Sequence, residues 1–291
     1  MKRNRIAFQA ILISMLLILS LVIIGSEKVE ENSKDPGESP QDPEFTSLVW
    51  SDEFEGAGAI DAEKWFHQTQ LPPGGNWWGG LIQHYTDRVE NSYVKDGYLH
   101  LVAKKEQYED QGEIKEYTSA RLNSKFAFTY GRVEVRAKLP AGIGTWPAIW
   151  MLNTTIDEDG AYWDNLGYGK VRWPVCGEID ILEHWGKKQD YVSSAVHNES
   201  SYGYNVENVG GQIVENASTQ FHIYTLEWTE EKMVFSVDGE AHFVYEPSIR
   251  NSKTWPYDSD YYIIMNIAIE PDIDPLFVES PMVVDYIRIY Q

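Results

Sequence analysis

Cysteine is almost missing from this chain. Cys176 is the single one among 291 residues, so no disulfide can form within the chain. Two interpretations of Cys176 stay open: a nucleophilic thiol with His184 or His197 as its base, and a small buried hydrophobic side chain. No signature of an activated cysteine surrounds it, and we therefore expect the buried side chain.

Basic residues are also scarce. The chain has 24 Lys and Arg against 45 Asp and Glu, which gives a formal net charge of −21. Such a surface repels nucleic acid and polyanionic ligands, so we expect no nucleic-acid partner.

Sustained helical periodicity and internal repeats are missing too. Apolar and polar residues alternate instead. Leu99, Leu101 and Ala103 fall on one strand face, and in residues 131–138 the charges lie opposite the valines. Asp238 and Gly239 mark a hairpin turn. Many short strands with frequent turns predict an all-β fold, an antiparallel β-sandwich of jelly-roll type with a concave cleft.

The N-terminus carries a long apolar run behind Lys2, Arg3 and Arg5. Residues 1–25 therefore predict a signal peptide or an N-terminal membrane anchor. Both place the rest outside the cytoplasm, so we expect a secreted, periplasmic or outer-surface protein. Residues 26–45 are rich in Glu, Asp, Ser and Pro and predict an acidic disordered linker. We expect residues 46–291 to form one folded domain, and the protein to be a monomer.

Three carboxylates lie close together in the segment 177–183. Glu178 and Asp180 share a strand face, because side chains repeat every two residues. Glu183 would face the other way on a regular strand, and a β-bulge near Ile181 and Leu182 would return it to the acidic face. Carboxyls this close raise at least one pKa, which suits a nucleophile beside an acid in glycoside hydrolysis. The alternative is a solvated acidic strand edge.

Gly177-Glu-Ile-Asp-Ile-Leu-Glu183 resembles the signature of glycoside hydrolase family 16 in its bulged E-x-D-x-x-E form. Within that family the chain is most similar to bacterial endo-β-1,3-glucanases (laminarinases), and the resemblance covers residues 46–291. It implies that Glu178 is the nucleophile, that Asp180 assists it and that Glu183 is the general acid/base. In a retaining site the carboxyls of Glu178 and Glu183 lie about 5–5.5 Å apart.

Aromatic residues are plentiful, with 11 Trp and 18 Tyr, and flat rings suit the faces of sugars. The paired tryptophans between Gln70 and Tyr85 and the Trp-Pro-Ala-Ile-Trp stretch resemble segments of laminarinases. The residues that we expect to bind substrate are Trp77, Trp78, Asn91, Arg121, Trp146, Trp150, Trp173, Trp185 and His197. For Arg121 an ion pair at the edge of the core stays an alternative, and for His197 a satisfied core histidine. For Trp77, Trp78, Trp146 and Trp150 the alternative is packing on the core.

The resemblance also implies a structural calcium ion, held by carbonyls near Glu53 and Gly97 together with Asp285. Oxygen ligands from distant strands suit calcium, and ordinary turn acids are the alternative. No cofactor is expected for catalysis.

These observations predict a retaining endo-glycosidase that hydrolyses β-1,3-glucan, a neutral polysaccharide that fits the negative charge. Alternatives within the family are hydrolysis of mixed-linkage glucan, agarose or another galactan. A non-catalytic β-glucan-binding protein and a structural surface protein are the alternatives of other classes.

Overall fold

The computed structural model describes residues 44–291. The predicted signal peptide or anchor (1–25) and almost all of the predicted linker (26–45) lie outside the described residues. In the described part of the chain, no helix combines the length and the apolar character needed to cross a membrane.

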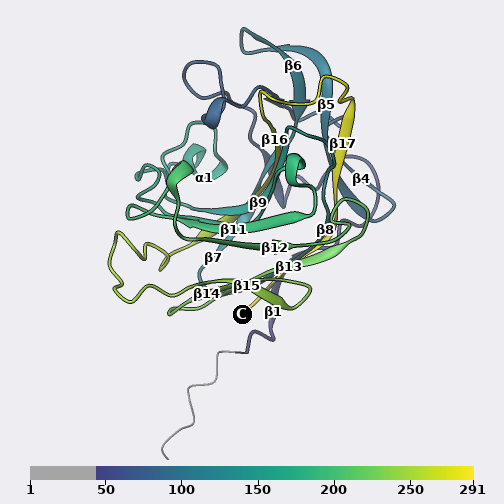
Figure 1. The fold of residues 1–291 in the computed structure, drawn as a ribbon. Helices are drawn as coiled ribbons and strands as arrows, with labels where there is room; N and C mark the ends of the chain where they lie inside the picture. The colour runs from purple at the N-terminus through teal and green to yellow at the C-terminus, as the bar shows by residue number, and fades with distance from the viewer. Residues whose placement is uncertain (1–43) are drawn as a thin grey trace, which may run out of the picture. The chain divides into compact units, whose positions relative to one another are not determined.

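Two β-sheets make up the fold (Figure 1). The larger sheet has ten strands, which in spatial order are β15 (Glu240–Tyr245), β14 (Met233–Val237), β13 (His222–Trp228), β8 (Gly131–Lys138), β17 (Glu279–Tyr290), β5 (Tyr98–Asp110), β6 (Glu113–Ser119) and β3 (His84–Tyr85), with β1 (Leu48–Asp52) beside β17 and β4 (Ser92–Lys95) beside β5.

The smaller sheet has seven strands, which in spatial order are β12 (Val209–Ile213), β11 (Tyr191–His197), β10 (Glu178–His184), β9 (Thr145–Asn153), β16 (Tyr261–Ile269), β7 (Arg121–Phe128) and β2 (Trp65–His67). Helical structure in the described residues is limited to one short α-helix and three 3₁₀ turns: α1 (Tyr162–Asn165), η1 (Trp78–Gly80), η2 (Gly186–Lys188) and η3 (Gly203–Asn205).

Nearly every strand pairing among the described residues is antiparallel; β3 with β6 is parallel. Neighbours in each sheet are often far apart in sequence, as where β16 lies between β9 and β7. The first strand closes against the last, with Ser47 and Gln291 exchanging backbone hydrogen bonds of 3.0 and 2.9 Å. The prediction of an all-β sandwich of jelly-roll type is confirmed.

The core lies between the two sheets. The alternation read from the sequence is seen in β5, where Leu99, Leu101 and Ala103 are fully buried. In β8, Val133 and Val135 are fully buried while the charged residues that alternate with them, Arg132, Glu134 and Arg136, are partly exposed. The smaller sheet contributes residues such as Ile179 and Met265 to the same core. Burial of this apolar surface is the main force that holds the sheets together.

Residue 176 belongs to a smaller apolar cluster that lies on the smaller sheet and includes Leu152, Tyr262 and Ile264. Cys176 is buried, and burial raises the pKa of its thiol above the ordinary range. A thiol held in this form is a poor nucleophile, so the interpretation of Cys176 as a packing residue holds.

Candidate active site

The central strand β10 places the three carboxylates, and its register contains the expected bulge. Against β9, Asp180 pairs with Trp150 and Leu182 with Ile149, so one extra residue enters β10 between them. Against β11, the register also shifts between Asp180 and Glu183. The predicted β-bulge at Ile181 and Leu182 is therefore confirmed.

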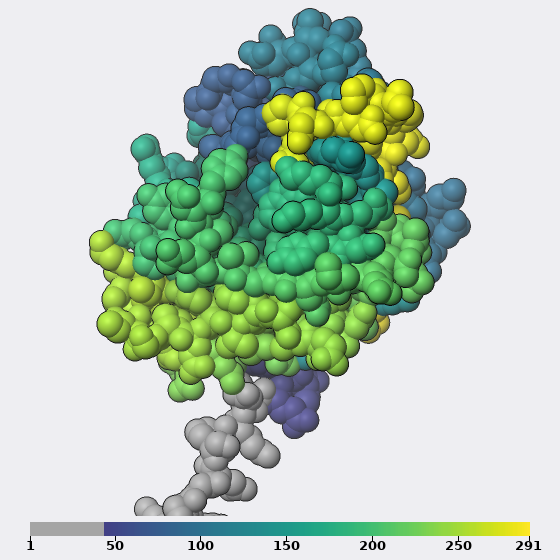
Figure 2. Space-filling model, viewed as in Figure 1, coloured from purple at the N-terminus to yellow at the C-terminus, as the bar shows by residue number. Residues whose placement is uncertain are grey.

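Burial along β10 shows what the bulge does. Ile179, Ile181 and Leu182 are all buried in the core between the sheets, although Ile181 and Leu182 are consecutive. In a regular strand one of these two would face the opposite side. Because both turn inward, Glu183 lies on the same face as Glu178, and both carboxylates stay partly exposed. Figure 2 shows a hollow on the molecular surface between green and teal segments of the chain.

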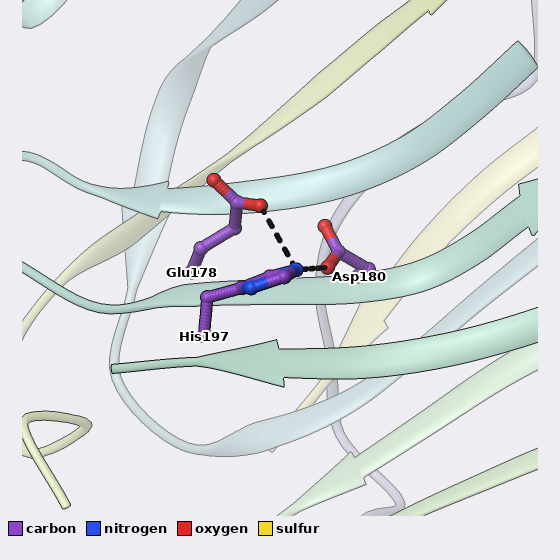
Figure 3. A group of neighbouring side chains, drawn as sticks. All are labelled: Glu178, Asp180 and His197. Carbon is purple, nitrogen blue, oxygen red and sulfur yellow. Dashed lines mark ion pairs between the residues drawn. The ribbon is translucent and has the colours of Figure 1, made fainter. Parts of the chain in front are cut away.

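Glu178 has two neighbours that favour its ionised form. The indole Nε1 of Trp173 donates a hydrogen bond of 2.9 Å to Glu178 Oε2. His197 Nε2 lies 3.6 Å from Glu178 Oε1 and 3.1 Å from Asp180 Oδ2 (Figure 3). Asp180 Oδ2 is buried and accepts no hydrogen bond. The interaction between His197 and Asp180 is therefore electrostatic.

The loop after β11 fixes the tautomer of His197. The backbone N–H of Gly203 donates a hydrogen bond of 3.1 Å to His197 Nδ1. In a neutral imidazole the other nitrogen must then carry the proton. His197 therefore directs an N–H at the Glu178–Asp180 pair, and it is more than a satisfied core histidine.

Glu183 has one donor, the indole Nε1 of Trp146, at 3.0 Å from Oε1. The ring of Trp146 stacks on Trp185, with the ring centroids 5.3 Å apart. Indole donors thus reach both glutamates, Trp173 at Glu178 and Trp146 at Glu183.

Burial raises the pKa of all three carboxyls. For Glu178, the charge of Asp180 raises the pKa further, while His197 and the hydrogen bond from Trp173 lower it. For Asp180, burial raises the pKa to about 8, against a hydrogen bond with Glu178 that lowers it. For Glu183, burial and then the charge of Asp180 raise the pKa to about 8.

This arrangement can keep protons at neutral pH while one carboxylate remains ionised. Glu178 and Asp180 titrate as a pair, because the proton of one can be hydrogen-bonded by the other. When one of the two carries a proton the other can stay ionised, and Trp173 and His197 favour the ionised form of Glu178. Burial and the charge of Asp180 both favour the protonated form of Glu183. A nucleophile and an acid are the groups that glycoside hydrolysis requires.

Several of the residues expected to bind substrate line the surface around the acids. Trp146 and Trp150 lie on the same face of β9 and are partly exposed. Trp78 is 53% exposed and Trp173 is 40% exposed. Together with Trp185, they offer ring faces and indole N–H groups to a ligand in the hollow.

Three of the residues expected to contact substrate are buried in this structure. Trp77 is 2% exposed and packs edge-on against Tyr85, so it cannot offer a ring face to a sugar. Asn91 is fully buried, and its amide donates to the Val102 carbonyl and to Thr118.

Arg121 is the third. It is 5% exposed and forms an ion pair of 2.8 Å with Glu158, which confirms the alternative of an ion pair at the edge of the core. Its guanidinium lies 4.8 Å from the ring centroid of Trp150. Arg121 thus packs against the ring of Trp150. Trp150 belongs to the surface around the acids that also carries Trp146 and Trp173, which we call the groove.

The sequence did not reveal two further neighbours of the groove. Asn266 in β16 accepts a hydrogen bond of 2.7 Å from Trp150 Nε1, and nothing in its surroundings in the sequence marks it. Tyr204 in η3 is 87% exposed, and its hydroxyl lies 3.4 Å from the Gly79 carbonyl in η1. This is long for an O–H···O hydrogen bond. The contact is therefore a weak link between two loops. One is the loop after β11 that contains η3, and the other is the loop after β2 that contains η1.

The three expected calcium ligands converge on a bulge in β17. The pairing of β1 with β17 ends at Asp52 and Ile287, and the pairing of β5 with β17 ends at Leu99 and Val284. Glu53 and Gly97 therefore both approach Asp285, where the register of β17 shifts against β8.

The side chains of Glu53 and Asp285 already form ion pairs, because Arg288 binds Glu53 at 2.8 Å and Arg136 binds Asp285. Backbone carbonyls are the oxygens that would fit a calcium ion here. Among the described residues, Glu178, Asp180 and His197 are the one group whose side-chain ligand atoms lie close enough together to hold a metal ion.

Comparison with known proteins agrees with this geometry. The family model described as "Glycosyl hydrolases family 16" matches residues 84–270. The chain is 41% identical over 261 residues to "Beta-glucanase" of Rhodothermus marinus, covering 84% of this chain and 85% of that protein.

Two solved structures share the fold. A LamA variant from Z. galactanivorans, in complex with laminaritriose and laminaritetraose, is 43% identical with a TM-score of 0.77, covering 85% of this chain and 100% of that one. The laminarinase from Rhodothermus marinus is 38% identical with a TM-score of 0.72, covering 84% and 97%. The bulged acidic strand, the two-sheet fold and these similarities together show that the chain belongs to glycosyl hydrolases family 16.

Proposed function

We propose that the protein is a retaining endo-β-1,3-glucanase. The observation that carries this proposal is the bulge in β10, which brings Glu178 and Glu183 to one face of the sheet with an indole donor on each. A binding protein on the same fold has no need for three neighbouring carboxyls with raised pKa values.

In the proposed reaction Glu178 attacks the anomeric carbon of the sugar, and Glu183 gives its proton to the departing glycosidic oxygen. The bond from carbon to that oxygen breaks as the bond from carbon to Glu178 forms. Glu183, now ionised, then takes a proton from water, which attacks the same carbon and releases Glu178. Asp180 keeps its proton near Glu178 and so balances charge between the two steps.

Three observations support a β-1,3-glucan as the substrate. One solved relative holds laminaritriose and laminaritetraose, and another is named a laminarinase. The net charge of −21 disfavours a polyanionic polymer. Exposed tryptophans at Trp78 and Trp173 would stack on successive uncharged sugar rings.

A panel of purified polysaccharides tests the proposal. Wild-type protein should release reducing ends from β-1,3-glucan, with short-chain products of several sizes early in the reaction, as expected for cleavage inside the polymer. Glu178→Gln should bind the glucan in gel retardation and release none. Cleavage of agarose in place of β-1,3-glucan, or equal turnover by Glu178→Gln, would contradict it.

Three further features are proposed with it. A calcium ion bound by carbonyls of Glu53 and Gly97 and by Asp285 would raise Tm, and EGTA should lower it. A monomer is proposed, and its mass is checked by light scattering. An extracytoplasmic location follows from residues 1–25, so mature protein should be recovered from the medium, periplasm or cell surface; cytoplasmic protein alone would contradict this.

A further inference from the structure

The bulge in β10 leaves one backbone segment without strand partners. Ile181 has no pairing partner on β9 or on β11, and Ser194 of β11 has none on β10. Ile181 is buried, so its carbonyl cannot turn to bulk water. A buried carbonyl without a partner is costly, and a bulge that survives here needs another donor.

Ser194 supplies that donor. Its hydroxyl donates a hydrogen bond of 2.8 Å to the Ile181 carbonyl, and Ser194 is fully buried. Alternation along β11 directs Ser194 away from the groove, since His197 three residues on lies beside the acids. The serine therefore reaches the bulge from the core side and leaves the groove face free.

His242 completes the arrangement from the other sheet. His242 Nε2 lies 2.8 Å from Ser194 Oγ. The one proton of the serine hydroxyl goes to Ile181, so the imidazole nitrogen must be the donor in this contact. The result is a directional chain that runs from His242 in β15 through Ser194 in β11 to Ile181 in β10.

We propose that Ser194 and His242 are positioning residues that hold the bulge, and with it Glu183, in the geometry for catalysis. This inference rests on the proposed role of Glu183 as general acid/base. Without the extra residue, a one-residue slip would turn Glu183 into the core and Leu182 outward. Neither Ser194 nor His242 touches the groove acids, so their effect passes through the backbone at Ile181.

The test separates a misplaced acid from a damaged fold. Ser194→Ala removes the donor, and His242→Leu removes the support for that donor, whereas His242→Gln can keep an N–H at a similar position. Ser119→Ala makes the same chemical change at another buried serine, one that lies in β6 of the larger sheet.

Two substrates give the discriminating readout. Cleavage of β-1,3-glucan needs a proton from Glu183, whereas the first step on a dinitrophenyl β-laminaribioside, whose leaving group departs without a proton, does not. Ser194→Ala and His242→Leu should lower kcat on the glucan about ten- to a hundredfold, with KM changed less than about threefold. The burst of dinitrophenolate should stay within about threefold of wild type, and His242→Gln and Ser119→Ala should retain glucan turnover.

Unchanged glucan turnover in Ser194→Ala would overturn the proposal, as would an equal loss on both substrates. Thermal unfolding of each variant identifies a loss of folded protein, and His242→Leu is then decisive because His242 is only partly buried. Glu183→Gln runs in parallel. If Glu183→Gln is inactive on the glucan while Ser194→Ala is fully active, the positioning role of Ser194 and His242 is wrong and the proposed function stands. If Glu183→Gln is active, the proposed function itself fails.

Discussion

Glu183→Gln should make the protein more stable at neutral pH while it destroys turnover. Burial and the charge of Asp180 raise the pKa of Glu183 from 4.5 to about 8. Below pH 4.5 the carboxyl is protonated in both the folded and the unfolded state, so it adds no pH-dependent cost. As the pH rises, the unfolded chain releases this proton and the folded protein keeps it, so folding stability falls until the pH passes about 8.

The magnitude follows from the two pKa values. At pH 7 the unfolded carboxyl lies about 2.5 pH units above its pKa, which corresponds to about 3 kcal/mol at about 1.4 kcal/mol per tenfold change. Glutamine has no proton to hold, and its oxygen can still accept the hydrogen bond from Trp146. For a domain of this size, 3 kcal/mol corresponds to a rise in Tm of about 6–12 °C.

Scanning calorimetry at pH 4 and pH 7, together with a reducing-sugar assay, measures both effects. The matched control is Glu215→Gln, because Glu215 is exposed to solvent. We expect Glu183→Gln to gain Tm over wild type at pH 7 and little at pH 4, and to lose at least about a hundredfold in turnover. A gain that is equal at both pH values, or no gain at pH 7, would refute the idea that Glu183 is held protonated by burial.

The remaining predictions concern the groups around the acids. Since Glu183 must be protonated to donate, kcat/KM should fall as the pH rises through about 8, and a pH–rate profile that stays flat to pH 9.5 would argue against this. Trp173→Phe removes the donor to Glu178, so Glu178 should be harder to ionise and kcat/KM should drop about ten- to a hundredfold; kinetics on the glucan test this, with Trp163→Phe as the control away from the acids. Tyr204→Phe removes only the weak contact with Gly79, so Tm should change by less than about 1 °C, and a larger change would show that the two loops are firmly joined.

The acidic strand could be predicted because its information is local. The alternation of Glu178, Ile179 and Asp180 fixes one face, and the position of Glu183 then requires an extra residue, which the register of β10 contains. The strand faces of β5 and β8 followed from the same period of two.

The fate of the aromatic and polar residues around the groove depended on packing between distant segments. Trp77 and Trp78 are adjacent in sequence, and one is buried while the other is 53% exposed. Asn91 resembled a sugar-binding amide, but strands β5 and β6 supply its hydrogen-bond partners and bury it. Asn266 was missed because its link to Trp150 spans more than a hundred residues.

Trapping the covalent intermediate shows which of the two glutamates is the nucleophile. A laminaribiosyl fluoride with fluorine at C2 of the reacting sugar forms the glycosyl–enzyme and releases it slowly, so that peptide mass mapping can locate the label. We expect a single labelled residue, Glu178, in protein that loses activity in step with labelling. A label on Glu183 or Asp180, or full inactivation without any covalent sugar, would contradict it.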